Sequence, residues 1–164
     1  MTYGVRVERQ RLRFMSAHMA TWEGACEPLH GHNYQLGVEV EGDLTADSWV
    51  IDFSTLKRIA RERCEALDHT FLLQRDSRVL RISQAGDQWQ ITTPAGRCYA
   101  FPAADVTVLP LDNTTAERLA EWLHAEIASA LRSAGATTIR HLRVEVEEAP
   151  GQTGWYAAAL PPFG

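Results

Sequence analysis

A stretch that begins with two histidines and continues with alternating apolar residues limits most strongly how this chain can fold. His30 and His32 lie two positions apart, and apolar side chains follow in the same phase over residues 34–40. In an extended strand, residues two apart point to the same face. Residues 12–18 alternate in the same way and end in His18. If these two predicted strands pair, three imidazoles converge at one end of one sheet.

Three neutral imidazoles with an open fourth position are typical of a catalytic zinc site. A lone His-x-His pair is usually a surface pair that binds nothing, but here a third histidine is in phase and Cys26 lies four residues before His30. In a structural zinc site, Cys26 would act as a fourth ligand and complete the coordination shell. The spacing therefore favours Zn²⁺ held by histidines, with Cys26 either near the metal or bound to it.

The composition limits the class of protein. The chain has 164 residues, 45% of them hydrophobic and 23% charged, which is typical of one globular domain over residues 1–164. A net charge of −5 without a basic run argues against a nucleic-acid surface. No apolar stretch reaches bilayer length and no signal-peptide pattern opens the chain, so we expect no membrane association. Three cysteines without a Cys-x-x-Cys motif argue against a disulfide framework and favour a cytoplasmic location.

Two helices are predicted from apolar spacing and capping residues. Ser54 is a candidate N-cap for a helix over residues 55–66. Thr114 and Glu117 have the capping-box spacing at the start of a second helix. His124 lies within this second helix, where we interpret it as a packing or solvent-contacting residue and not as a metal ligand.

The remaining segments complete an α+β pattern. Residues 74–110 contain short strands and a tight turn, which indicate a hairpin-like excursion. In the last alternating strand, residues 142–148, Glu148 falls in phase with the apolar face. A carboxylate there costs free energy unless it meets a partner, so Glu148 either lies in water at the strand end or contacts a donor-rich ligand such as a guanidine-like ring edge. We expect an antiparallel sheet with both helices on one face.

Together, these features resemble the 6-pyruvoyl-tetrahydropterin synthase / 6-carboxy-tetrahydropterin synthase family. The resemblance covers most of the chain except about residues 74–110, which look like an insertion. It implies the T-fold (tunnelling fold), in which subunits join their sheets into a barrel and two trimeric rings stack into a homohexamer. The residues that carry the resemblance are His18, the segment Cys26–His32, the segment Val50–Phe53, Leu67–His69, Thr114–Glu117 and Glu148.

The resemblance also implies a role for each site residue. The family fixes zinc by three histidines, uses a cysteine base and an Asp-His proton relay that a neighbouring subunit can donate, and anchors the pterin ring on a glutamate. Glu27 directly follows Cys26, as in a mixed branch of the family, and we group it with the substrate-binding residues; a plain loop carboxylate is the alternative. The implied assignments are His18, His30 and His32 for the metal, Cys26, Asp68 and His69 for catalysis, and Glu148, Thr115 and Glu27 for substrate.

The function that the resemblance implies is a zinc-dependent lyase. It would convert 7,8-dihydroneopterin triphosphate to 6-carboxy-5,6,7,8-tetrahydropterin for the queuosine (deazaguanine) pathway, without an organic cofactor. Alternatives within the fold are the pyruvoyl-forming synthase and a folate-branch enzyme that releases 6-hydroxymethyl-dihydropterin. A different class, a non-catalytic zinc-containing module that binds pterins or purines, has no use for a base and a relay. Residue patterns alone leave Asp68 and His69 open to a plainer interpretation, a helix cap beside a surface imidazole.

Overall fold

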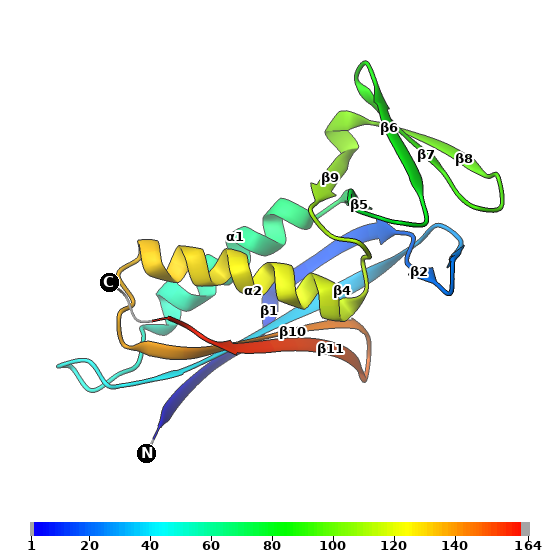
Figure 1. The fold of residues 1–164 in the computed structure, drawn as a ribbon. Helices are drawn as coiled ribbons and strands as arrows, with labels where there is room; N and C mark the ends of the chain where they lie inside the picture. The colour runs from blue at the N-terminus through cyan, green and yellow to red at the C-terminus, as the bar shows by residue number, and fades with distance from the viewer. Residues whose placement is uncertain (1, 162–164) are drawn as a thin grey trace.

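A six-stranded sheet with two helices on one face forms the body of the protein (Figure 1). The computed structural model describes residues 2–161. The strand order is β11-β10-β4-β1-β5-β9, and the α+β architecture with both helices on one face is as predicted. The strands are β1 (Tyr3–His18), β4 (His30–Gly42), β5 (Thr70–Gln74), β9 (Val106–Leu109), β10 (Ile139–Ala149) and β11 (Gln152–Ala159), and the helices are α1 (Phe53–Leu67) and α2 (Ala116–Ser133).

The pairing of β1 with β4 sets the position of the histidines. These strands are antiparallel, and their register places His18 opposite His30 and Ser16 opposite His32. Apolar side chains in the same phase pack against α1 and α2, so one continuous core fills the space between sheet and helices. The histidines therefore extend the buried face of the sheet at one end of the strand pair.

Two strand pairs differ from the predicted antiparallel arrangement. β5 runs parallel to β1, and β9 runs parallel to β5, so the sheet is mixed. α1 carries the chain across the sheet face from the end of β4 to β5, which runs antiparallel to β4 and hence parallel to β1. Parallel neighbours need a long crossover connection, and between β5 and β9 the excursion supplies it.

The excursion is a three-stranded antiparallel sheet rather than a hairpin. Its strands are β6 (Arg81–Ala85), β7 (Gln88–Thr92) and β8 (Cys98–Pro102), followed by the 3-10 turn η1 (Ala103–Asp105). The inserted sheet is thus shorter than the expected 74–110, because both ends of that range belong to the main sheet. Phe101 stacks on Phe71 of β5 with ring centroids 4.4 Å apart, which joins the inserted sheet to the main one.

The helix starts show which capping groups are used. The α1 N-cap is Asp52, whose carboxylate accepts from the backbone N–H groups of Ser54 and Thr55, so the helix starts two residues earlier than expected and Ser54 does not cap it. The α2 N-cap is Thr115, which accepts from Arg118 N–H. The expected capping box from Thr114 is not formed, because that side chain turns inward. Within residues 2–161, neither helix combines the length and apolar character of a membrane span.

Candidate metal centre

The structure brings the three predicted histidines together. One ring nitrogen from each of His18, His30 and His32 lies within 4.8 Å of the others. His18 is the deepest, with 2% of its surface exposed. Among the described residues, Cys26 does not belong to this group of closely spaced ligand atoms, so the arrangement is an open three-imidazole site rather than a closed four-ligand one.

Hydrogen bonds fix which nitrogen faces inward in two of the rings, His18 and His30. His18 Nδ1 lies 3.1 Å from the backbone oxygen of Thr114, and His30 Nδ1 lies 2.8 Å from that of Pro28. A carbonyl oxygen can only accept, so both rings carry their proton on Nδ1 and direct an Nε2 lone pair inward. This is the tautomer that metal-binding histidines adopt when a neighbour holds the other nitrogen.

The spacing of the inward nitrogens suits a tetrahedral metal ion. His18 Nε2 and His30 Nε2 lie 3.2 Å apart, and two lone pairs facing each other at that distance repel unless a cation lies between them. Zn–N bonds of 2.0–2.1 Å in a tetrahedral site place two nitrogens about 3.3 Å apart. The residues present therefore fit a zinc ion, with a fourth position left open.

The electrostatics favour the neutral form of two of the rings, His18 and His32. Burial, followed by the neighbouring His30 and His32, lowers the pKa of His18 to about 4. Burial, followed by His30, also lowers the pKa of His32. Because a metal binds the neutral imidazole, a site with depressed histidine pKa values does not have to release protons to accept a cation at pH 7.

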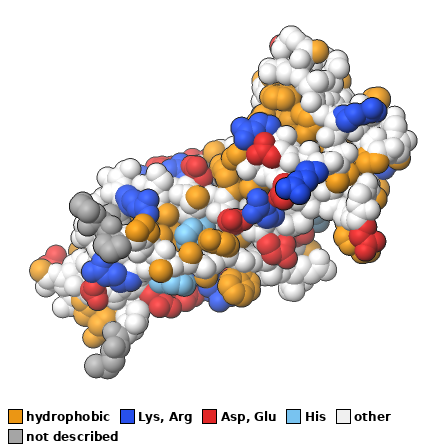
Figure 2. Space-filling model, in the orientation of Figure 1, with side chains coloured by type: hydrophobic (Ala, Val, Ile, Leu, Met, Phe, Trp, Pro, Cys, Tyr) orange, Lys and Arg blue, Asp and Glu red, His pale blue; other side chains and the backbone are white. Residues whose placement is uncertain are grey.

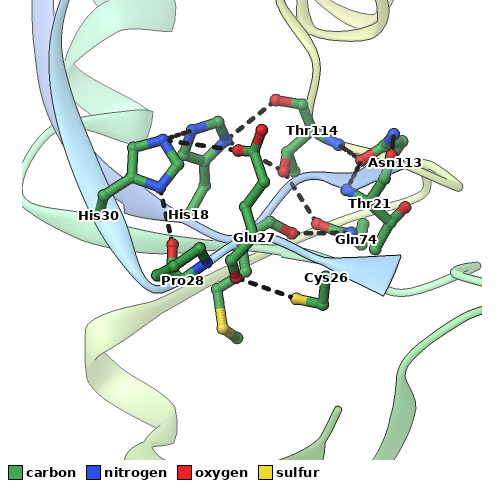
Figure 3. A network of polar contacts seen from close by, with 10 residues as sticks. His18, Thr21, Cys26, Glu27, Pro28, His30, Gln74, Asn113 and Thr114 are labelled. Carbon is green, nitrogen blue, oxygen red and sulfur yellow. Dashed lines mark hydrogen bonds and ion pairs between the residues drawn. The ribbon is translucent and has the colours of Figure 1, made fainter. Parts of the chain in front are cut away.

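A short hairpin, β2 (Thr21–Trp22) and β3 (Ala25–Cys26), presents two different groups beside the histidines. The Glu27 carboxylate lies 3.8 Å from Nε2 of His30, whereas the Cys26 thiol donates to the Glu27 backbone oxygen at 3.3 Å. Figure 3 shows the carboxylate directed toward the rings and the thiol directed away from them. Burial raises the pKa of the Cys26 thiol, Arg97 opposes this, and Glu27 adds to it.

Two unpaired buried polar atoms lie on the same side of the sheet. Within the described part of the chain, Glu148 Oε1 and the Tyr34 hydroxyl are buried without a hydrogen-bond partner. Burial raises the pKa of Glu148, and Glu117 and Glu27 raise it further. Burial likewise raises the pKa of Tyr34, whose ring is 5.3 Å from that of His32. Buried polar groups are rarely left unsatisfied, so this pair indicates a ligand with hydrogen-bond donors.

A cleft of about 670 Å³ lies between the ends of β4 and β10 and reaches Glu148. The pairing of β10 with β4 ends at Glu147 and Gln35, and beyond that point the strands separate. His32 and Glu148 both line the resulting cleft, and Arg9 lines it as well. The separation of the two strands therefore gives a small molecule access to a metal ligand and to the unpaired carboxylate together.

Asp68 and His69 form a pair at the end of α1. His69 Nδ1 lies 2.8 Å from the Asp68 carboxylate, which also accepts from Met15 N–H at 2.7 Å and thereby has a lowered pKa. The His69 side chain is 71% exposed, and its backbone has a φ of 58°. It lines a second cleft of about 540 Å³ with Phe101 and Asp105 of the inserted sheet and its 3-10 turn. No hydrogen bond or ion pair among residues 2–161 joins His69 to the three clustered histidines.

Several residues of the site escape sequence reasoning. Thr114 and Gln74 are buried polar residues, and their hydrogen bonds support His18. In the sequence, Tyr34 cannot be distinguished from the other apolar residues of an alternating strand. Thr115, expected near the substrate, uses its hydroxyl to cap α2. The pair of adjacent threonines could have pointed to Thr114, because only one of the two can serve as the N-cap and the other is free for another contact.

Comparisons with known proteins point to one family. The family model of 6-pyruvoyl tetrahydropterin synthase matches residues 7–159. A Methanocaldococcus jannaschii protein provisionally named a 6-carboxy-5,6,7,8-tetrahydropterin synthase is 34% identical over 150 residues, which is 91% of each chain. An Aquifex aeolicus 6-carboxy-5,6,7,8-tetrahydropterin synthase is 29% identical over 80% of this chain and 76% of its own.

Solved structures show the same similarity. The crystal structure of 6-pyruvoyl tetrahydropterin synthase from Plasmodium vivax superposes with a TM-score of 0.92 at 30% sequence identity, covering 98% of this chain and 99% of that one. A variant of the same enzyme, described as a catalytic-residue mutant in which a glutamate is replaced by alanine, superposes equally well. With nearly all of both chains covered, the inserted sheet lies within the similarity.

Proposed function

Because the chain belongs to the 6-pyruvoyl tetrahydropterin synthase family, we propose that it is a zinc-dependent lyase that converts 7,8-dihydroneopterin triphosphate to 6-carboxy-5,6,7,8-tetrahydropterin. Two of its relatives carry the name of that enzyme, one of them provisionally. Its place in metabolism would then be the queuosine (deazaguanine) pathway in the cytoplasm. The observation that supports the proposal most strongly is the open three-imidazole site beside an unpaired buried carboxylate.

The substrate-binding residues follow from the cleft. Glu148 would accept hydrogen bonds from the amino-pyrimidinone edge of the pterin, which presents two adjacent N–H donors to one carboxylate. This contact would satisfy the atom that is unpaired in the free protein. Thr115 at the start of α2 would lie near the ring, and Glu27 would lie near the side chain of the substrate.

The metal would be held by His18, His30 and His32. Zinc, when bound, supplies a Lewis acid that acidifies the side-chain hydroxyls and adjacent C–H groups of the substrate. The protein's own residues then have to move protons. Cys26 is the proposed base, since a thiolate is a good proton acceptor near neutral pH. The nearby Arg97 opposes the effect of burial on the pKa of this thiol.

The proton relay would be Asp68 and His69. The carboxylate accepts from His69 Nδ1, which leaves Nε2 free to take and return a proton. Because this pair is exposed and no hydrogen bond or ion pair among residues 2–161 joins it to the clustered histidines, we propose that it serves the site of a neighbouring subunit. A homohexamer of two stacked trimers, in which sheet edges of adjacent subunits pair, would bring the two halves together and cover those edges.

A second function within the fold is favoured by one observation. Glu27, not Cys26, is the residue directed at the metal centre, and the Plasmodium vivax 6-pyruvoyltetrahydropterin synthase is described as having a catalytic glutamate. This chain carries both residue types at adjacent positions, Cys26 and Glu27. Pyruvoyl formation or release of 6-hydroxymethyl-dihydropterin is therefore the alternative, and a non-catalytic pterin- or purine-binding module is the alternative from another class.

One experiment separates these functions. The purified protein is incubated with 7,8-dihydroneopterin triphosphate, and the products are identified by mass. The proposal predicts 6-carboxy-5,6,7,8-tetrahydropterin together with acetaldehyde and triphosphate. Loss of triphosphate without carbon–carbon cleavage would indicate the pyruvoyl route, and unchanged substrate would indicate a binding module.

A further inference from the structure

Gln74 is a buried polar residue at the end of β5, two hydrogen bonds away from a metal-site histidine. Only 1% of its surface is exposed. Its side-chain Nε2 donates to the backbone oxygen of Met19 at 3.1 Å, and its Oε1 accepts from the Thr114 hydroxyl at 2.8 Å. Figure 3 shows Thr114 beside His18, with Gln74 on the far side of Thr114 from the rings. These two side chains therefore lie where the main sheet, the loop before α2 and the metal site meet.

The direction of each hydrogen bond follows from the donors available. The Met19 oxygen can only accept, so the amide of Gln74 turns its nitrogen to Met19 and its oxygen to Thr114. The Thr114 hydroxyl has one proton and gives it to that oxygen. Toward His18 the hydroxyl can then only accept, and it lies 3.2 Å from His18 Nδ1.

This chain of bonds sets the state of His18. With both the hydroxyl and the backbone oxygen of Thr114 acting as acceptors, His18 Nδ1 has to carry the proton. We infer that Gln74 is a positioning residue: by making the Thr114 hydroxyl an acceptor, it adds a second hydrogen bond to that of the Thr114 carbonyl and holds His18 in the orientation that presents its Nε2 to the metal. This inference rests on the proposed metal site and adds an outer residue to it.

The plainer role for Gln74 is to satisfy the Met19 oxygen and nothing more. The two roles differ in what a substitution changes. A purely structural glutamine would alter folding stability alone, whereas a positioning residue alters metal affinity and the ligand field of the bound ion. Partners that orient metal-binding histidines typically contribute 10–100-fold to metal affinity.

The neighbouring Asn113 provides an internal contrast. Its side chain accepts from Thr21 N–H at 2.9 Å and donates to the Thr21 oxygen at 2.7 Å, so it holds the hairpin that carries Cys26 and Glu27. It also accepts from Thr114 N–H at 3.0 Å, but among the described residues no hydrogen bond joins it to His18 or to the Thr114 hydroxyl. Asn113→Ala is thus expected to loosen the hairpin and reduce turnover while zinc affinity stays within about twofold of wild type, since the bonds to His18 are kept.

The test measures metal binding, not only activity. Zinc dissociation constants are determined by competition with a chromophoric chelator for wild type, Gln74→Met, Thr114→Val and the double variant, and the visible spectrum of each cobalt-substituted protein is recorded. Gln74→Met keeps the volume and removes both hydrogen bonds. We expect about 10-fold weaker zinc binding and an altered cobalt spectrum, with the double variant no weaker than the weaker single one because both act through one chain of bonds.

Two further variants control for folding. Thr114→Ser keeps the hydroxyl and should restore wild-type affinity. Thr93→Val removes a hydroxyl that is similarly buried, at 2% exposure, but lies in the turn between β7 and β8 and accepts from Arg97 N–H. This variant should lower stability and leave zinc affinity unchanged. If Gln74→Met does not fold by circular dichroism, Thr114→Val against Thr114→Ser carries the same comparison.

The outcomes are distinct. If Gln74→Met and Thr114→Val bind zinc with the same affinity and the same cobalt spectrum as wild type, the role of Gln74 is overturned. The proposed function is then left standing. Additive losses in the double variant would also overturn it, since they would indicate two independent effects. If wild type binds no zinc, the metal site itself is overturned, and the inference with it.

Discussion

The carboxylate of Glu27 lies 3.8 Å from Nε2 of His30, and no comparable contact joins Cys26 to the clustered histidines among the described residues. The two side chains are adjacent in the sequence but point in different directions from the same hairpin. This divergence means that a base role for Cys26 and a metal-ligand role for Cys26 make different predictions.

Replacing Cys26 by Ala should leave zinc bound and abolish product formation. The thiol is outside the ligand group, so metal content stays at the wild-type level, while loss of a general base typically lowers the rate by 10²–10⁴-fold. Metal content by mass spectrometry and product formation by chromatography are measured on the same sample. Glu27→Gln, at the adjacent position, is measured in the same way for comparison. Loss of zinc in Cys26→Ala would show that the cysteine is a metal ligand.

Replacing Glu148 by Gln should weaken pterin binding and stabilise the free protein. The pKa of this carboxylate is raised by burial, so its ionised form is disfavoured in the folded state and its destabilising effect grows as pH rises through and above the ordinary pKa of a glutamate, about 4.3. A neutral amide removes that effect but cannot accept two charge-assisted bonds. Fluorescence titration with neopterin and thermal unfolding at pH 7.5 are the measurements.

The control for this variant is the adjacent carboxylate. Glu147 Oε1 accepts from Gly151 N–H in the turn between β10 and β11, so Glu147→Gln should not raise the melting temperature. An unchanged neopterin affinity in Glu148→Gln would contradict the role of this residue as the pterin anchor.

Mixing two inactive variants should restore activity if the relay comes from a neighbouring subunit. His30→Ala loses the metal site and His69→Ala loses the relay. In mixed oligomers, about a quarter of the sites would combine an intact metal site with an intact His69 from the adjacent chain. The variants are co-refolded and assayed, with each refolded alone as control. If both functions reside in one chain, every site is defective and the mixture stays inactive.

His124 should make stability depend on pH. It is buried at the contact of α2 with β11, 4.9 Å from the Tyr156 ring, and its Nε2 has no partner within the described chain. Burial has the largest effect on the pKa of His124 and lowers it. His141 of β10 also lowers this pKa, whereas Glu121 on α2 raises it. The folded state therefore binds fewer protons than the unfolded one, so stability is lost as pH falls below about 6.5.

The measurement for His124 is urea unfolding of the metal-free protein between pH 7.5 and 5.5. Because His18 and His32 also have lowered pKa values, the relevant quantity is the difference between wild type and His124→Phe. Wild type should lose stability relative to the variant as pH falls. Parallel curves would mean that His124 does not titrate in this range.

The strands and the histidine cluster could be predicted because period-two alternation fixes the faces of a strand pair. His18, His30 and His32 share a phase with buried apolar residues, so pairing of the two strands was sufficient to bring them together. Glu148 was detectable for a similar reason, as a carboxylate in an apolar phase. These features depend on local pattern alone.

Other features depend on contacts distant in the sequence. β11 was not predicted, in part because one of its helix-facing positions is a glycine: a Cβ at Gly154 would lie 2.6 Å from that of Ala116, so close packing with α2 selects glycine there and weakens the apolar signal. The parallel pairing of β5 follows from the path of α1 across the sheet. Thr114 and Gln74 become site residues only once β5 lies beside the loop before α2.

The central claim is that three imidazoles hold one zinc ion, and the most direct test is the metal content of purified protein. Wild type and His30→Ala are loaded with zinc, freed of excess metal on a desalting column and analysed by mass spectrometry, with folding checked by circular dichroism. We predict one zinc per wild-type chain and less than about a tenth of that in His30→Ala, since two histidines do not complete a zinc site. A folded His30→Ala protein that keeps a full zinc ion per chain would contradict the account.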